Sequence, residues 1–345
     1  MTLVRTPEQR ELQQVVRDFL AAHAPEEHVR RWMETGTGHD PRLWSLMAGQ
    51  LGLQALAIPE EYGGAGFGHA ELAVAMEELG RAVTCGPFLS SAVLAAQAVL
   101  HCGTGQAKKD LLPGIADGTT IATLALDGPF DAVETDGGWT VTGTAGFVTD
   151  GALADVVLVT GTGDRLFAVT AAERTPVETM DGTRKMARVR CDGTPATLAG
   201  RAGPVLGRAL DAAAILLAAE QLGVAQRALD MAVSYARDRV QFGRPIGSFQ
   251  AIKHRCAEML VEVEAARSCV AAAVRALDGD APPGETASMA ALARTWACEA
   301  AARTTAENIR IHGGIGFTFE HPAHLYYRRA KADHVLLGTP DRARA

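Results

Sequence analysis

The sequence contains no CxxC pair, no long apolar run and no excess of positive charge. Its six cysteines are scattered, which argues against the common zinc and thiol-redox motifs and predicts free, mostly buried thiols. No stretch approaches the roughly 18 apolar residues of a membrane-spanning helix, so none is expected. The N-terminal segment also lacks the apolar core of a signal peptide, and we expect a cytosolic (cytoplasmic) protein.

Lysine is scarce as well, because only five of the 33 basic residues are Lys. The net charge of −7 argues against a protein that binds nucleic acid through a basic surface. With 48% apolar residues the chain has enough apolar surface for a sizeable core, so disorder is not expected. A length of 345 residues predicts two or three domains.

The pattern of apolar residues changes twice along the chain. It has helical spacing up to about residue 119, short β-type runs at 120–126, 139–143, 155–160 and 166–170, and long helical stretches at 206–239, 249–278 and 285–312 followed by a short tail. Asp136-Gly137-Gly138 has the chemistry of a hairpin turn. The fold class is therefore α+β: an N-terminal α-helical domain at 1–119, a middle β-barrel or sandwich domain at 120–205, and a C-terminal helical bundle at 206–345.

Two segments concentrate residues that can bind a ligand. The first, YARDRVQFGRPIGSFQ at 235–250, gathers cations, amides and aromatic rings around a turn between two long helices. A cation at the end of a helix suits the helix dipole and can also pair with a phosphate, although a solvated helix–loop–helix connection has the same pattern. The second, IHGGIGFT at 311–318, resembles a phosphate-binding glycine loop. It follows a helix instead of a strand, which excludes a Rossmann site.

Together with IPEEYGGAG at 58–66, EELGR at 77–81 and GGIGFTFEHP at 313–322, these segments resemble the acyl-CoA dehydrogenase family over essentially the whole chain. The resemblance implies a helical domain, a β domain and a four-helix bundle, with FAD between the β domain, the bundle and a neighbouring subunit. It also implies α,β-dehydrogenation of an acyl-CoA thioester. A carboxylate removes the α-proton, the β-hydride passes to flavin N5, and electrons leave through an electron-transfer flavoprotein.

The same resemblance implies which residues bind the cofactor. Arg239 and Phe242 correspond to contacts with the diphosphate and adenine side of a neighbouring subunit's FAD, and glycines lie along its adenosine half. Phe147 corresponds to a residue that stacks beside the flavin, and Thr149 to one that hydrogen-bonds near N5. The full expected set is Arg239, Gln241, Phe242, Phe147, Thr149, Gly313, Gly314 and Thr339.

The sequence differs from the family at positions that, by the resemblance, would contact the flavin and the substrate bound by the same chain. Leu126 stands at the position of a threonine that binds the pyrimidine edge of the flavin, and leucine cannot donate that hydrogen bond. Arg310 replaces a glutamine that contacts adenosine. The usual catalytic base falls on Leu337 and the alternative base on Ala213, so neither position carries a carboxylate to accept the α-proton.

Glu220 is the remaining candidate for a catalytic base within the chain. It interrupts an apolar helix face two turns from Ala213, and burial there would raise the pKa of its carboxyl, as a base requires. The same position also suits an ion pair with an arginine in the bundle or at a subunit contact. His321 and His324 lie three apart without a third ligand nearby, so no metal site is expected.

Four interpretations follow. The first is a subunit of a hetero-oligomeric acyl-CoA dehydrogenase, similar to some actinobacterial enzymes of sterol side-chain degradation, in which a partner chain supplies the base and shares the FAD sites. The others are a self-sufficient homo-oligomer with an unusual base, a flavin monooxygenase of the same fold, and a non-enzymatic structural subunit.

Overall fold

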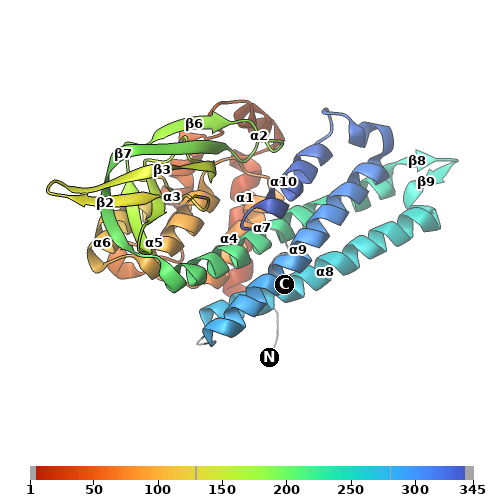
Figure 1. Ribbon diagram of the computed structural model, residues 1–345. Coiled ribbons are helices and arrows are strands. Elements are labelled where there is room, and N and C mark those ends of the chain that lie inside the picture. The colour runs from red at the N-terminus through yellow and green to blue at the C-terminus, as the bar shows by residue number, and fades with distance from the viewer. Residues whose placement is uncertain (1–4, 129, 280, 339–345) are drawn as a thin grey trace. The chain divides into compact units, whose positions relative to one another are not determined.

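The computed structural model describes residues 5–128, 130–279 and 281–338. Helices come first, strands follow, and long helices close the chain (Figure 1). The architecture is a helical N-terminal part, a central sheet and a helical C-terminal part, as the sequence predicts. Among the described residues, no helix is both long enough and apolar enough to cross a membrane.

The N-terminal helices begin where local capping chemistry allows. They are α1 (Pro7–His23), α2 (Glu26–Met33), α3 (Pro41–Leu51), α4 (His69–Arg81), α5 (Ala96–Cys102) and α6 (Gly105–Ala116). Thr6 and Gln9 form a reciprocal capping box at the start of α1. Asp40 caps α3, because its Oδ1 accepts from the backbone N of Arg42 at 2.9 Å. A fully buried π-helix at Phe88–Ala95 precedes α5, where the sequence predicts ordinary helix; apolar spacing does not reveal this wider turn.

The central sheet has seven strands: β1 (Ala122–Leu124), β2 (Asp131–Thr135), β3 (Gly138–Thr149), β4 (Val156–Gly161), β5 (Arg165–Val169), β6 (Glu173–Val177) and β7 (Met186–Arg201). Their order is β1-β4-β5-β7-β3-β2, and β6 also pairs with β7. Only the β1–β4 pair among these is parallel. The predicted hairpin turn joins β2 to β3, with Thr135 opposite Gly138.

The longest strand, β7, is one that the sequence does not predict. Its buried residues alternate irregularly, and Gly193 and Pro195 interrupt the run. β2 and β6 are also absent from the prediction, because most of their residues are exposed and lack an apolar face. Pairing with a neighbouring strand, and not local pattern, makes these segments strands.

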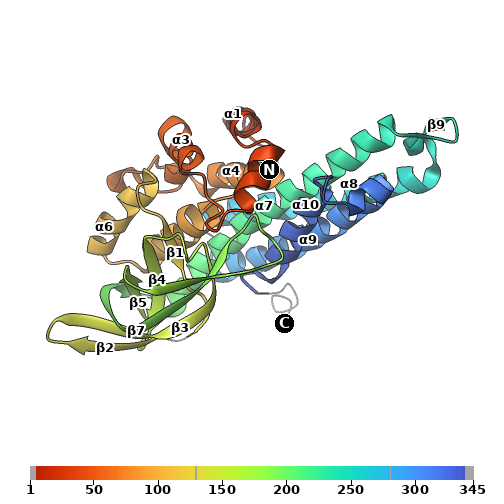
Figure 2. The same cartoon turned by 90° about the horizontal axis from the view of Figure 1, so that it is seen from above.

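The C-terminal helices are α7 (Gly203–Asp238), α8 (Gln250–Asp278), α9 (Pro283–His312) and α10 (Ala323–Val335). The first three match the predicted long helices within a few residues, and α8 and α9 run side by side (Figure 2). The expected short tail after residue 312 is wrong, since residues 323–335 form α10. Its charged composition hides an apolar face that includes Leu325, Tyr326 and Ala330.

By compactness the chain divides into two units, and the division cuts through α4 and α7. One contains the described residues up to 27, residues 73–84 and the described residues from 214 onward; the other contains residues 28–72 and 85–213. The domain boundaries near 119 and 205 stay a prediction. All six cysteines are free thiols, and Cys85, Cys102, Cys191 and Cys298 are buried.

The EELGR segment binds three helices together within the first unit. Glu78 on α4 accepts from Arg17 of α1 at 2.7 Å, and Glu77 accepts from Arg267 of α8 at 3.1 Å. A Cβ at Gly80 would lie 2.1 Å from the backbone O of Glu220, so only glycine allows α4 and α7 to cross this closely.

Candidate functional site

A short hairpin follows α7 and presents the first predicted group of cofactor residues. It consists of β8 (Val240–Gln241) and β9 (Arg244–Pro245), and its turn holds Phe242 at φ 51°. Phe242 is 91% exposed, and Arg239, Gln241 and Arg244 are exposed beside it. The guanidinium of Arg244 lies 4.2 Å from the ring centroid of Phe249. The hairpin therefore displays an aromatic ring among cationic and amide groups. This combination suits a ligand that carries a nucleobase and a phosphate group.

The second predicted group lies on the 3-10 turn that ends α9, Gly313–Phe317, called the glycine turn below. Gly313 has φ 62° and ψ −137°, a conformation that side chains disfavour. A Cβ at Gly316 would lie 2.5 Å from the backbone O of Ile309, whereas Gly314 has open space around it. Phe317 is 75% exposed at the end of the turn.

Stacked aromatic rings bring the two groups together. The ring of His312, directly before the glycine turn, stacks on Tyr235 of α7 with a centroid separation of 4.3 Å. The ring of His321 also contacts His312, with a centroid separation of 4.2 Å and the two ring planes tilted by 43°. The two segments that the sequence predicts to bind a ligand, about 70 residues apart in sequence, thus lie at the same end of the helical bundle.

The β-domain residues form a separate group at the end of β3. Phe147 is 63% exposed and Leu126 is 40% exposed. Thr149 is buried, and its hydroxyl donates to the Sδ of Met186 at 3.6 Å instead of facing solvent. Asp127, which the sequence analysis did not single out, accepts from the backbone N of Gly146 at 2.8 Å. The pairing of β3 with β7 is irregular at this amide, so the strand pairing leaves its N–H without a partner. The carboxylate of Asp127 accepts that hydrogen bond instead.

The three positions considered for a catalytic base differ in their surroundings. Ala213 is fully buried in the middle of α7. Leu337 is half-buried with φ 61°, directly after α10. Glu220 is buried, and its Oε1 accepts from Nη1 of the equally buried Arg329 on α10. Thr339 lies outside the described residues.

The ion pair at Glu220 corresponds to the structural alternative in the sequence analysis. Arg329 also donates to the backbone O of Thr84 at 3.3 Å, so it joins α10 to the segment after α4 as well as to α7. A guanidinium in direct contact stabilises the ionised form of the carboxylate, which weakens it as a proton acceptor. This geometry favours a structural role for Glu220.

A second buried arginine, which sequence reasoning missed, fixes the segment that contains Leu337. Arg294 on α9 donates to the backbone O of Leu336 at 2.6 Å, of Asp333 at 3.1 Å and of Gly338 at 3.4 Å. Its other terminal nitrogen donates to Oε1 of Gln221 at 2.8 Å. Residues 336–338, called the C-terminal turn below, are therefore held against the bundle by one guanidinium. The feature of the sequence that could have identified Arg294 is an arginine among alanines on a long predicted helix.

Asp211 is a further carboxylate that the sequence analysis did not weigh. Burial raises the pKa of its carboxyl above the ordinary value for aspartate. It lies on α7 two residues before Ala213. Two residues turn a helix by about 200°, so Asp211 and Ala213 lie on nearly opposite faces of α7.

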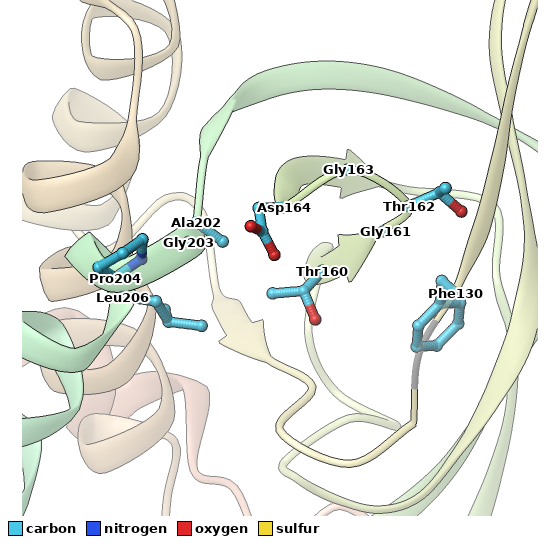
Figure 3. A pocket seen from close by; sticks show the side chains of 10 residues that line it. All are labelled: Phe130, Thr160, Gly161, Thr162, Gly163, Asp164, Ala202, Gly203, Pro204 and Leu206. Carbon is cyan, nitrogen blue, oxygen red and sulfur yellow. The ribbon is translucent and has the colours of Figure 1, made fainter.

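A cavity of about 520 Å³ lies beside the β4–β5 turn and the start of α7 (Figure 3). Among the described lining residues Asp164 alone is charged, and Figure 3 shows its carboxylate directed toward Ala202 and Gly203. None of the predicted site residues that the structure describes lines this cavity. A lone carboxylate disfavours an anionic cofactor there, so the cavity does not belong to the candidate site.

Family models match both ends of the chain. The acyl-CoA dehydrogenase N-terminal domain matches residues 6–119, and the acyl-CoA dehydrogenase C-terminal domain matches residues 203–345. Acyl-CoA dehydrogenase IpdE2 of Mycolicibacterium smegmatis is 41% identical over 334 residues, which cover 96% of each chain. IpdE2 of Mycobacterium tuberculosis is 42% identical over 97% of this chain and 94% of its own.

Two solved structures are also similar. The ChsE4–ChsE5 complex from Mycobacterium tuberculosis matches with a TM-score of 0.92 at 30% identity, over 99% of this chain and 96% of that chain. The steroid ACAD Tcur3481–Tcur3483 matches with a TM-score of 0.89 at 35% identity, over 97% of this chain and 95% of that chain.

Proposed function

Because the chain belongs to the acyl-CoA dehydrogenase family of oxidoreductases, we propose that it acts as one subunit of a hetero-oligomeric, FAD-dependent acyl-CoA dehydrogenase. In this proposal a partner chain of the same family supplies the catalytic base, and the two chains share FAD sites. The observation that carries the proposal is that both base positions implied by the family resemblance, Leu337 and Ala213, lack a carboxylate.

The hairpin and the glycine turn suit the diphosphate and adenosine half of FAD. Arg239 and Arg244 bring fixed positive charge to pair with phosphates, and Gln241 adds an amide donor. The exposed ring of Phe242 offers a flat apolar surface on which the adenine ring can lie. Gly313, together with Gly314, lets a ligand approach the backbone closely. When bound, FAD accepts the hydride that leaves the β-carbon of the substrate.

The edge of the β domain does not suit the pyrimidine edge of a flavin. Leu126 has no donor to offer, and the carboxylate of Asp127 already accepts from the amide of Gly146. A carboxylate here opposes negative charge that develops on a ligand, and the hydroxyl of Thr149 is directed at Met186. Phe147 is the expected flavin contact that remains exposed. We infer that this chain contributes the adenosine half of a shared FAD site and that its partner contributes the flavin half.

The proton chemistry then depends on the partner. A general base contributes about 10²–10⁴-fold to such a reaction, and in this chain an α-proton meets no carboxylate at either expected position. Glu220, the one candidate from the sequence, is held by Arg329 inside the bundle. The chain's own contribution is therefore to bind and orient the cofactor.

The names of similar proteins indicate the substrate class. Tcur3481–Tcur3483 is described as a steroid ACAD, and ChsE4–ChsE5 is described as a complex. We propose a steroid-derived acyl-CoA thioester as the substrate, with electrons passing to an electron-transfer flavoprotein as in the family generally.

The test compares the chain alone with the chain co-expressed with a neighbouring-gene homologue. Bound FAD per chain is measured, and bleaching of the flavin absorbance is followed with butyryl-CoA and with a steroid acyl-CoA. We expect no stoichiometric FAD in the chain alone, and FAD that is reduced by an acyl-CoA in the assembled pair. Stoichiometric FAD reduced by an acyl-CoA in the chain alone would show that the proposal is wrong. Glu220→Gln and Asp211→Asn would then identify the base.

A further inference from the structure

The rings of Tyr235, His312 and His321, called the ring stack below, lie at the point where three helix ends meet. Tyr235 belongs to the last turn of α7, His312 is the last residue of α9, and His321 precedes α10. The Nδ1 of His321 accepts from the backbone N of Ala323 at 3.2 Å, so this ring is fixed to the start of α10. The ring stack thus connects the end of α7 to the end of α9 and to the segment just before α10.

His312 is the central ring and has little freedom. Its Nδ1 lies 2.8 Å from the backbone O of Asn308, one turn earlier in α9, and donates its proton to it. The ring of Tyr235 stacks on it at a centroid separation of 4.3 Å, and the ring of His321 contacts it at 4.2 Å with a tilt of 43°. A Cβ at Gly316 would lie 2.9 Å from the Cβ of His312, so the glycine turn packs directly onto this residue. The position of His312 therefore determines the position of the glycine turn.

Tyr235 also lies at the point where the β8–β9 hairpin leaves α7. The backbone N of Arg239 donates to the backbone O of Tyr235 at 2.9 Å, and the backbone N of Ile246 donates to the backbone O of Arg239 at 2.8 Å. A Cβ at Gly247 would lie 2.8 Å from the backbone O of Ala236, so the 3-10 turn after the hairpin, Ile246–Ser248, also packs against this turn of α7. A shift of Tyr235 would move the whole hairpin.

We propose that Tyr235, His312 and His321 are positioning residues for the cofactor: their stack sets the hairpin and the glycine turn at a fixed spacing, so that both reach the same FAD molecule. This proposal rests on the proposed function, because it presupposes that the two segments bind one dinucleotide. The ring of Phe242 pairs with Phe249, and a Cβ at Gly314 would meet nothing within 4 Å, so in this proposal the three rings act through the backbone that they hold.

The first test measures hydrogen exchange in the full-length chain, without FAD. We expect His312→Ala to speed amide exchange about tenfold in both the hairpin, 240–246, and the glycine turn, 313–317, because both lose the ring that joins them. His312→Phe keeps an aromatic ring and is expected to restore most of the protection. Faster exchange in the glycine turn with an unchanged hairpin would overturn the proposal.

The second test measures FAD binding by the assembled pair of chains. We expect His312→Ala to raise the Kd of FAD about tenfold while kcat at saturating FAD stays unchanged, with His312→Phe close to the native Kd. Val263→Ala, a fully buried position in the middle of α8, serves as the matched control for general destabilisation. An equal rise in the Kd of FAD in Val263→Ala would show that the ring stack acts only as an ordinary core contact and does not position the cofactor.

The two tests separate this proposal from the proposed function. If the pair of chains binds no FAD but the hairpin and glycine turn exchange together, the proposed function is wrong and the coupling between the segments remains. If FAD binds and the Kd is insensitive to His312→Ala, the proposed function stands and the ring stack does not position the cofactor.

Discussion

At the scale of single residues, Glu220 shows how one contact changes the meaning of a carboxylate. Alone on an apolar helix face it has the environment of a base. Its contact with the buried Arg329 makes it a partner in an ion pair that joins α7 to α10. Removing one member of such a pair leaves the other charge buried and uncompensated.

We therefore predict that Glu220→Gln lowers the free energy of unfolding by about 3–5 kcal/mol, because the guanidinium of Arg329 loses its counter-charge. Urea denaturation of the chain checks this. In the assembled enzyme, turnover per folded molecule should not change. The control is the double variant Glu220→Leu with Arg329→Met, which should recover most of the lost stability. A drop in turnover of about 10²-fold or more in folded Glu220→Gln would instead identify Glu220 as the base.

Arg294 is the second residue whose role depends on a distant segment. Three backbone carbonyls in and before the C-terminal turn accept from it, and such carbonyls at a helix end have no partner within the helix. We predict that Arg294→Met lowers the free energy of unfolding by about 2–4 kcal/mol and speeds amide exchange at 333–338.

The matched control for Arg294 is Arg303→Met on the same helix. Arg303 is exposed and pairs with Glu262 at 2.7 Å on the surface, so its loss should change stability by less than about 1 kcal/mol. Equal effects of the two substitutions would contradict a special role for Arg294.

At the scale of elements, the proposed function assigns the β8–β9 hairpin a role in cofactor binding that is independent of folding stability. Phe242 is almost fully exposed, so its ring adds little to folding. We predict that Phe242→Ser changes the melting temperature by less than about 2 °C and raises the Kd of FAD in the assembled pair about tenfold. Val240→Ser, which removes another exposed apolar side chain from the hairpin, should leave the Kd unchanged; if it does not, the effect belongs to the hairpin as a whole.

The end of α9 is expected to make stability sensitive to acid. Burial lowers the pKa of His312 below its ordinary value of 6.5, so the folded chain binds this proton less readily than the unfolded chain. Stability from the neutral ring is present above about pH 6.5 and falls as the pH drops through that value. His39 and His101 have pKa values lowered by burial too and act in the same direction.

We predict that the difference in unfolding free energy between native chain and His312→Phe shifts in favour of the variant as the pH falls from about 7.5 to about 5.5. Chemical denaturation at several pH values measures it. A difference that stays constant over this range would show that His312 does not titrate differently in the folded chain.

Elements also show where apolar patterns fail. Long helices with a continuous buried stripe were predictable to within a few residues. β7 and α10 were not, because tertiary partners supply their stability: β7 pairs with β3, β5 and β6, and α10 is held by Arg294 and by the Glu220 ion pair. A pattern of one segment does not reveal the segment against which it packs.

At the scale of the whole molecule, the proposal predicts complementary chains. In the assembled enzyme, replacing the base of the partner with glutamine should lower turnover by at least about 10²–10⁴-fold, because this chain brings no carboxylate to the reaction. Stopped-flow reduction of the flavin by acyl-CoA measures it. A rate that only halves would mean that this chain catalyses independently.

The sequence by itself determined the order of helical and β regions, because spacing and residue type are local properties. The two segments predicted to bind a ligand and the base positions without a carboxylate rest on the family resemblance, and they stay predictions. Only the tertiary structure decided what Glu220, Arg294 and His312 do. Each of them is defined by a partner on another helix: Arg329 of α10, the carbonyls of the C-terminal turn, and Tyr235 of α7. Helical periodicity tells which face a side chain occupies, but the group across that face is set by how distant segments pack.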